Sequence, residues 1–330
     1  MSNVSISDTV ATEQGGGFAV QKRLKVTNNS TLNLQNVKAG RNGGGLFALA
    51  EVDIDGSSTV KVSNSQAHSG DGGGLLIEKG LNISSGSTLI ILNATAASHG
   101  GGFWVGGEML ALSNSTVSVQ HATAGKWGGG FLASDQVVIA AGSTVSISDA
   151  VAAESGGGFQ VRKHLQVMCK STLNIQNVKA GDSGGGFNAE GQVEVRESSI
   201  VKISNSHAVS ASGGGFHTNE LNIFNRSVLI ILNATAGSSG GGFHSSGKAA
   251  VFSSSTISIQ HTRAGLFGGG FIAVDKVVIA GRSTVSIFDA VAADQGGGFQ
   301  VEKHLQVTSH STLNLQDVKA GKHGGGFHAF

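Results

Sequence analysis

Apolar residues in this chain recur in short alternating segments, three to each unit of about 28 residues. In one unit, Thr144–Ser148 places Val145 and Ile147 on one face, and the segments Phe159–Val161 and Leu165–Val167 follow. Alternation over so few residues, rich in β-branched side chains and bounded by Gly, Ser and Asn, predicts strands. No segment has helical periodicity. The pattern therefore predicts an all-β protein.

A glycine triplet marks every unit. Ten of the triplets are followed by Phe, and the other two by Leu46 and Leu75. A repeat this regular outranks local signals. It predicts a right-handed parallel β-helix (β-solenoid) with three short strands per rung and about twelve rungs of 28 residues, roughly 58 Å long. The triplets begin at Gly15, Gly43, Gly72, Gly100, Gly128, Gly156, Gly184, Gly213, Gly240, Gly268, Gly296 and Gly324.

In addition to the 28-residue repeat, the sequence has a longer repeat of five rungs, about 140 residues. The segment 4–11, Val-Ser-Ile-Ser-Asp-Thr-Val-Ala, returns with small changes at 145–152 and 285–292. Residues 1–330 are thus expected to form one solenoid array without separate domains, in which each rung packs against its neighbours. Neither end has an obvious polar cap. This indicates a segment of a longer surface protein, or rods that associate end to end or side by side.

The glycine triplets need a structural reason, because each ordered glycine costs about 0.5–1 kcal/mol relative to alanine. We expect either a positive φ or a corner too crowded for a Cβ atom. The Phe that follows each triplet is expected to point inward, and so are the apolar residues of the first and third strands. Each buried apolar side chain stabilises the fold by about 1.5–3 kcal/mol.

A column of Asn, Asp and His closes the first strand of every rung. By parity with Val145 and Ile147, these side chains are expected to point inward or into the corner. A ladder of hydrogen bonds and a line of cation ligands are both compatible with them, and the mixed composition suits a ladder better; no metal or other cofactor is expected. The structural ladder is assigned to Asn36, Asn93, Asp149, Asn177, Asn233 and Asp289.

The loop before each triplet varies most. Trp127 and Phe267 occupy equivalent places one block apart. They are candidates for contact with a glycan, a host or cell-surface protein, or a neighbouring rod. Alternatively, they fold over the corner glycines.

The charge and the residue composition of the chain limit the kinds of partner it is expected to bind. The net charge is +1 and charged residues make up 13% of the chain, so it has no electrostatic footprint for nucleic acid. No apolar run is long enough for a membrane span. Cys169 is the single cysteine and has no partner for an internal disulfide. The first residues lack a signal-peptide layout, so an extracellular location implies a signal outside this sequence.

Sequons for N-glycosylation are frequent in this chain. Asn28, Asn29, Asn114 and Asn225 lie in the corner that joins the third strand to the first, where glycans are expected in a secreted eukaryotic protein, and Asn82 is a further candidate.

Two other functions remain open. Enzymes with this fold cleave polysaccharides through acidic clusters, but here the acids are sparse: Glu51, Asp53 and Asp55 form one group, and Glu190, Glu194 and Glu197 another. No catalytic residue is assigned, and the chain is not expected to be an enzyme. An outward column of threonines suggests ice binding, although Ile200 and Val228 interrupt it and threonine is a common strand residue.

The repeated Gly-Gly-Gly-Phe, followed by Leu-x-Val and Ser-Thr-Val-Ser-Ile-Ser, resembles the β-helical repeats of chlamydial polymorphic outer membrane proteins and related surface adhesins. The chain lacks the Gly-Gly-Ala-Ile and Phe-x-x-Asn motifs of that family. The resemblance implies a β-helix with a structural or adhesive role at the cell surface, and it assigns no functional residues.

Overall fold

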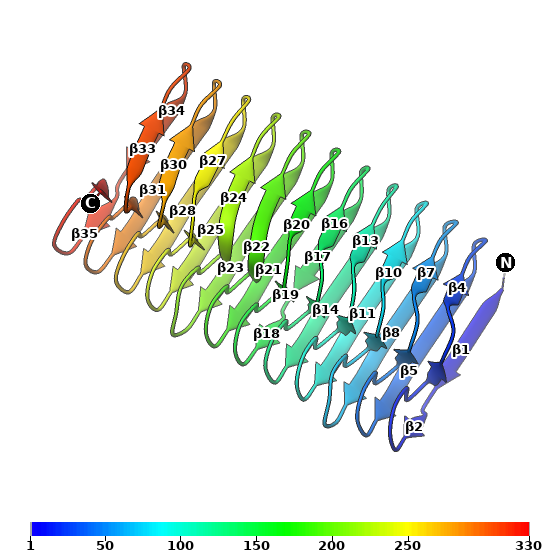
Figure 1. Cartoon of the computed structure of the whole chain (residues 1–330). Helices are drawn as coiled ribbons and strands as arrows, with labels where there is room; N and C mark the ends of the chain where they lie inside the picture. Colours follow the sequence, from blue (N-terminus) through cyan, green and yellow to red (C-terminus); the bar gives the residue numbers. More distant parts are fainter. Residues whose placement is uncertain (1, 330) are drawn as a thin grey trace.

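The computed structural model describes residues 2–329, which form strands and connecting turns without any helix. The chain winds into a straight stack of rungs with its two termini at opposite ends (Figure 1). One rung consists of β5 (Thr31–Ala39), β6 (Leu46–Ala48) and β7 (Val52–Ile54). All pairings between rungs are parallel; for example, Leu32 of β5 lies opposite Val60 in the next rung. The predicted parallel β-solenoid is confirmed.

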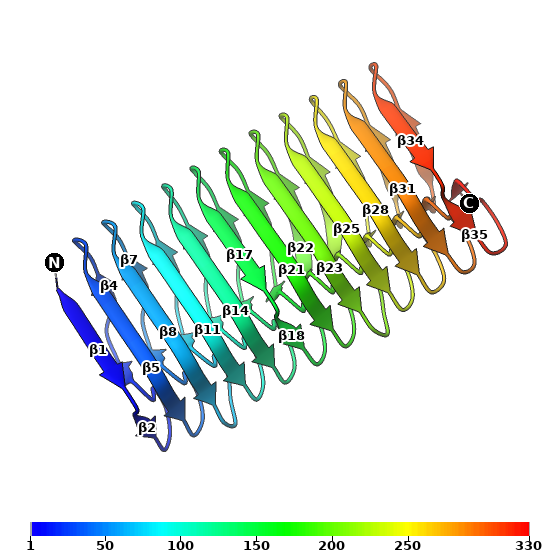
Figure 2. The same ribbon diagram turned by 180° about the vertical axis from the view of Figure 1, so that it is seen from behind.

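Two parallel sheets run the length of the stack, and the view from behind shows the first one (Figure 2). The first sheet contains β1 (Asn3–Ser7), β2 (Val10–Ala11), β5, β8 (Thr59–Ala67), β11 (Thr88–Ala96), β14 (Thr116–Ala124), β17 (Thr144–Ser148), β18 (Val151–Ala152), β21 (Thr172–Ala180), β23 (Ile200–Ala208), β25 (Val228–Ala236), β28 (Thr256–Ala264), β31 (Thr284–Ala292), β34 (Thr312–Gln316) and β35 (Lys319–Ala320).

The second sheet combines the second and third strands of each rung. It contains β3 (Phe18–Val20), β4 (Leu24–Val26), β6, β7, β9 (Leu75–Ile77), β10 (Leu81–Ile83), β12 (Phe103–Val105), β13 (Met109–Ala111), β15 (Phe131–Ala133), β16 (Val137–Ile139), β19 (Phe159–Val161), β20 (Leu165–Val167), β22 (Phe187–Val195), β24 (Phe216–Ile223), β26 (Phe243–Ser245), β27 (Ala249–Val251), β29 (Phe271–Ala273), β30 (Lys276–Ile279), β32 (Phe299–Val301), β33 (His304–Val307) and β36 (Phe327–Ala329). In β22 and β24 the second and third strands merge into one.

The first strand does not end at the polar column, as the alternation suggested. Asn36 has a φ of 53°, in the left-handed region that Asn tolerates better than most residues. It inserts one extra residue into the alternation, so Leu34 before it and Val37 after it both point inward and are fully buried although they are three residues apart. The expected inward orientation of the column is therefore wrong. Its side chains lie at the surface, exposed or half-buried.

The glycine triplet meets two different backbone demands, as Gly43, Gly44 and Gly45 show. Gly43 has a φ of 61°, which disfavours any residue with a Cβ atom. A Cβ on Gly44 would lie 2.0 Å from the carbonyl oxygen of Gly73 in the next rung, and one on Gly45 would lie 2.8 Å from that of Gly74. The triplet is a corner in which backbone packs directly on backbone.

The core is a set of single-residue columns. Phenylalanine rings from Phe103 to Phe327 stack on one another with centroids 4.7–5.2 Å apart and planes within 11° of parallel. Leu46 and Leu75 continue this column toward the N-terminus and are buried. Aromatic pairs at this separation are stabilised beyond the area they bury.

A second column, of buried serines, was not identified from the sequence. The backbone N–H of Ser58 donates to Oγ of Ser87 at 3.1 Å, and Ser115, Ser143 and Ser171 repeat this contact along the corner before the first strand. These hydroxyls satisfy backbone donors that are removed from water. The serine that precedes the threonine in most units was the available signal.

Candidate functional site

The polar column of the first strand forms hydrogen-bonded ladders at the surface. Nδ2 of Asn36 donates to Asp8 at 2.8 Å, and Asn64 and Asn93 continue the series at 2.9 Å. A second ladder has the same form and comprises Asp149, Asn177, Asn205 and Asn233. The amides use both their donor and their acceptor along the ladder, so the column acts as a brace between rungs. Within residues 2–329 no group of three or more His, Cys, Asp or Glu side chains is placed to hold a metal ion.

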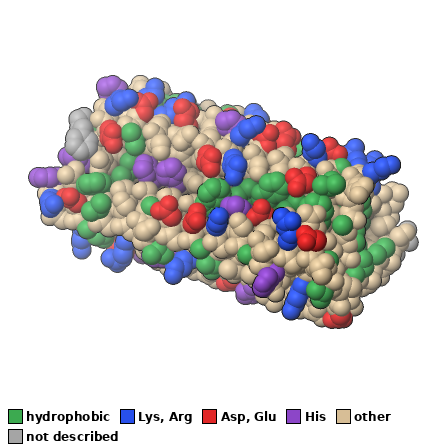
Figure 3. All heavy atoms as spheres, turned by 60° about the horizontal axis from the view of Figure 1, so that its bottom comes forward, with side chains coloured by type: hydrophobic (Ala, Val, Ile, Leu, Met, Phe, Trp, Pro, Cys, Tyr) green, Lys and Arg blue, Asp and Glu red, His purple; other side chains and the backbone are tan. Residues whose placement is uncertain are grey.

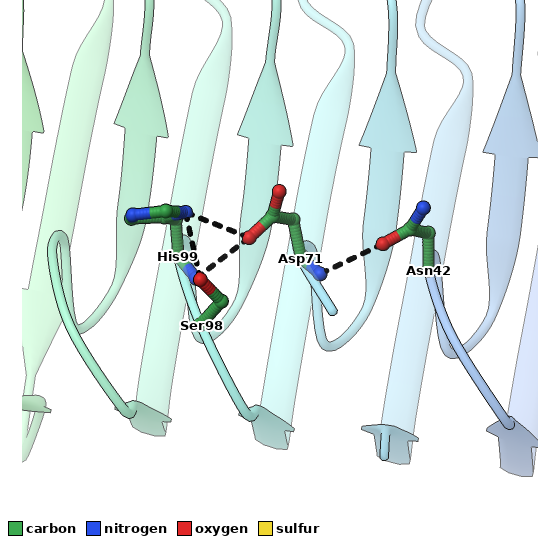
Figure 4. Close-up of polar contacts among 4 residues, drawn as sticks. All are labelled: Asn42, Asp71, Ser98 and His99. Carbon is green, nitrogen blue, oxygen red and sulfur yellow. Dashed lines mark hydrogen bonds and ion pairs between the residues drawn. The ribbon is translucent and has the colours of Figure 1, made fainter. Parts of the chain in front are cut away.

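The corner loops of the first block form a separate hydrogen-bonded chain (Figure 4). Oδ1 of Asn42 accepts the backbone N–H of Asp71 at 3.0 Å, and Oδ1 of Asp71 accepts the backbone N–H of His99 at 2.9 Å and lies 2.8 Å from its Nδ1. Burial opposes the charge of Asp71, but the hydrogen bonds from His99 hold its pKa below the usual value. Ser98 and Asp71 both contact Nδ1 of His99, so the group is not a proton relay to the serine.

Trp127 extends this chain by one rung. Its ring lies 4.8 Å from the His99 ring at a tilt of 42°, and the guanidinium of Arg162 lies 5.5 Å from its centroid. Phe267, one block later, is half-buried and forms an isolated bridge with Gln295. Trp127 thus packs within its own chain, and a role for Trp127 or Phe267 in recognition stays a prediction.

Four of the five predicted glycosylation sites lie at one corner. Asn28, Asn29, Asn114 and Asn225 have φ values between 56° and 60°, and their side chains are exposed. Asn82 lies instead within β10, where it is half-buried and its Oδ1 has no hydrogen-bond partner. The corner Asn residues are therefore the accessible ones, and their glycosylation stays a prediction.

The acidic groups and the threonine column occupy outer faces. Asp53 is buried and forms a bidentate ion pair with Arg23, while Glu194 and Glu197 lie 3.6 and 3.7 Å from Arg196. The threonines lie in register along the first sheet, as from Thr59 to Thr88, and Ile200 and Val228 pair in the same column.

An outward column of the second sheet contains polar residues that were not identified as a site from the sequence. Gln160, Asn188, His217 and His244 lie side by side on β19, β22, β24 and β26. Gln160 donates to Glu190 at 2.9 Å, Asn188 donates to Gln160 at 2.9 Å, and Nδ1 of His217 lies 3.1 Å from Oδ1 of Asn188. The sequence shows that these residues share a position two residues after each triplet. It does not show how far they are buried or which residues they contact.

His244 is expected to make the fold sensitive to mild acid. Burial, assisted by the neighbouring His217, lowers the pKa of His244 to about 4 from 6.5. Between these values the unfolded chain binds a proton that the folded chain does not, so stability falls as the pH drops from about 6.5 to about 4. The loss is of the order of 3 kcal/mol. Urea denaturation across this range should show it.

The matched control is His244→Ile, because Ile272 occupies the same column in the next rung and is buried there. This variant should lose that part of the acid sensitivity. Parallel pH profiles for the variant and the parent chain would contradict the assignment.

Cys169 should react slowly with thiol reagents although it is exposed. Its Sγ–H donates to Glu197 at 2.7 Å, and this carboxylate raises the pKa of the thiol above its usual value of 9.0. Less thiolate is then present at pH 8, and the thiolate is the reactive form. Glu197→Gln should increase the rate of Ellman's reaction in the folded chain and leave the rate in denaturant unchanged. An unchanged rate in the folded variant would argue against this hydrogen bond.

No helix within residues 2–329 has the length and apolar character that a membrane-spanning helix requires. Comparison of the chain with protein-family models, with curated proteins and with solved structures finds no match.

Proposed function

We propose that this chain is a rigid β-solenoid rod with a mechanical role outside the cell, as a segment of a surface stalk, coat or filament. The observation that carries the proposal is the continuity of the stack. Both sheets keep their parallel pairing from rung to rung, and the phenylalanine column and the serine column each continue along the stack at their own place in the rung. Over residues 2–329 neither sheet is interrupted between one rung and the next.

The physical argument is cooperativity between rungs. Each rung is joined to the next by backbone hydrogen bonds of two sheets and by side-chain hydrogen bonds and stacked rings. Bending the rod at one place must strain these contacts together, because they lie at different corners of the same cross-section. A solenoid of this kind resists bending and keeps its two ends at a fixed separation.

The surface is compatible with exposure to solvent and to other chains. Lys, Arg, Asp, Glu and His side chains are interspersed on the face in Figure 3, and no single sign of charge dominates it. An adhesive role and association of rods end to end or side by side belong to this proposal. The resemblance to surface adhesins supports an extracellular location.

Electron microscopy of the purified chain and of the native material tests the proposal. We expect straight rods whose length matches the stack, and longer filaments or surface projections in the native material. Antibody labelling of intact and permeabilised cells should place the epitope outside. Flexible particles would contradict the rod, and labelling only after permeabilisation would contradict the location. Release of unsaturated oligosaccharides from pectin, or inhibition of ice recrystallisation, would support the enzyme or ice-binding alternative instead.

A further inference from the structure

The two copies of the five-rung block carry residues of different character in one outward column of the second sheet. In the first block the outward residues of β6, β9 and β12 are Phe47, Leu76 and Trp104. Phe47 and Leu76 are buried there. In the second block, the equivalent residues of β22, β24 and β26 are Asn188, His217 and His244, and all three are half-buried. The fold accepts apolar residues at these positions, so the polar set is not a requirement of the stack.

The loops beside this column differ in a matching way. In the first block the residues before the triplets are Asn42, Asp71 and His99, which are joined by hydrogen bonds across the rungs (Figure 4). In the second block, the equivalent residues are Ser183, Ser212 and Ser239. A serine side chain is too short to repeat these contacts. The polar column of the second block therefore lies beside shorter loop side chains than its apolar counterpart.

A hollow of about 580 Å³ lies at the start of this column. Gln160 and Asn188 form its floor, and Trp127 stands at one end. Its rim includes the exposed carboxylates of Glu154, Asp182 and Glu190 and the hydroxyl of Ser210. We name this hollow, with its floor residues Gln160 and Asn188 and its rim, the trench. His217 and His244 continue the same outward column in the next two rungs.

Hydrogen bonds hold the trench floor in a defined order. Hydrogen bonds run from Glu190 through Gln160 and Asn188 to His217. They orient both amides, because the NH2 group of each amide donates to one neighbour and its oxygen contacts the next. His244 ends the row, and both of its ring nitrogens are buried without a hydrogen-bond partner. An unpaired buried polar group costs about 1–3 kcal/mol.

The chemistry of the trench points to one ligand class. Three carboxylates, and no lysine or arginine, are among the described residues that line the hollow, so an anionic ligand would be repelled. The amides of Gln160 and Asn188 and the hydroxyls of Ser155 and Ser210 offer both donors and acceptors, which suits a ligand with many hydroxyl groups. We propose that the trench of the second block binds a neutral carbohydrate chain laid along the rod axis. This goes beyond the rod function and does not depend on it.

The test is a binding screen with the full chain. Linear neutral hexaoses of glucose, mannose and galactose, a polyanionic oligogalacturonate and a chitosan oligomer would be immobilised, and hits measured by isothermal titration calorimetry. We expect at least one neutral hexaose to bind. The triple variant Asn188→Phe, His217→Leu and His244→Trp, which installs the residues of the first block, should weaken binding by roughly tenfold or more.

Two further variants keep the result interpretable. Glu154→Ala removes an exposed rim carboxylate and should weaken binding without affecting the fold. Thr59→Ala on the first sheet should bind as the parent chain does. Circular dichroism establishes that each variant is folded. Absence of binding to every neutral hexaose, binding confined to the charged oligomers, or equal affinity of the folded triple variant would each overturn the proposal.

Discussion

Replacement of Gly157 by alanine is expected to prevent formation of a stable rod. The added Cβ would lie 2.2 Å from the carbonyl oxygen of Gly185 and 2.6 Å from the carbonyl carbon of Lys179. Both are backbone atoms tied into the neighbouring rung and strand, so neither can move without breaking ladder hydrogen bonds. We expect a loss of more than about 4 kcal/mol, outside the range of ordinary substitutions. Soluble yield and urea denaturation followed by circular dichroism measure it.

The matched control is Gly325→Ala, at the same place in the last triplet. A Cβ atom there has no neighbour within 4 Å. This variant should unfold within about 0.5 kcal/mol of the parent chain, as substitutions without lost contacts usually do. Comparable stability for Gly157→Ala would refute the explanation of the triplet by backbone crowding.

Replacement of Phe187 by alanine is expected to cost about 3–5 kcal/mol, as truncation of a buried phenylalanine does. The side chain is fully buried, and its ring stacks on Phe159 at 4.9 Å and on Phe216 at 4.7 Å. Its removal leaves a cavity in the middle of the column, and the neighbouring rungs cannot close it because their spacing is set by the backbone. The midpoint of urea denaturation should fall accordingly.

Two controls separate stacking from size. Phe187→Leu should cost less than half as much as the alanine variant, because Leu46 and Leu75 already occupy this column in other rungs and are buried. Phe267→Ala, in a half-buried corner loop outside the column, should cost about 1 kcal/mol or less. Equal losses for Phe187→Ala and Phe267→Ala would show that the stack adds nothing to stability.

The architecture followed from the sequence because its signals are local and repeated. Alternation around Val145 and Ile147 identifies a strand. The spacing of the Gly-Gly-Gly-Phe repeats gives the number of residues in each rung. Any one strand is too short to identify with certainty, but the same pattern in every rung removes the ambiguity. The crowding around Gly157 could also be expected. Glycine costs stability wherever the chain is ordered, so its recurrence at the same position in every rung indicates that the backbone requires it there.

The orientation of the polar column could not be predicted from the alternation of inward and outward residues along the strand. Asn36 adopts a positive φ within the strand, and this single conformation shifts the parity of every residue after it. Its hydrogen bond to Asp8 joins residues 28 positions apart, so its geometry depends on the stacking of two rungs. The burial of Ser87 and its bond to Ser58 depend on the same stacking.

The sequence by itself determined the repeat, the inward columns and the positions of the corners, because these depend on the order of apolar, polar and glycine residues along the chain. Only the tertiary structure decided which outward residues meet. Gln160, Asn188, His217 and His244 lie in separate rungs, and nothing local connects them. Stacking brings them into one row, and at the start of that row it gathers the carboxylates of Glu154, Asp182 and Glu190 around a hollow. The rod can therefore be read from the period of the chain, whereas the trench depends on contacts between rungs.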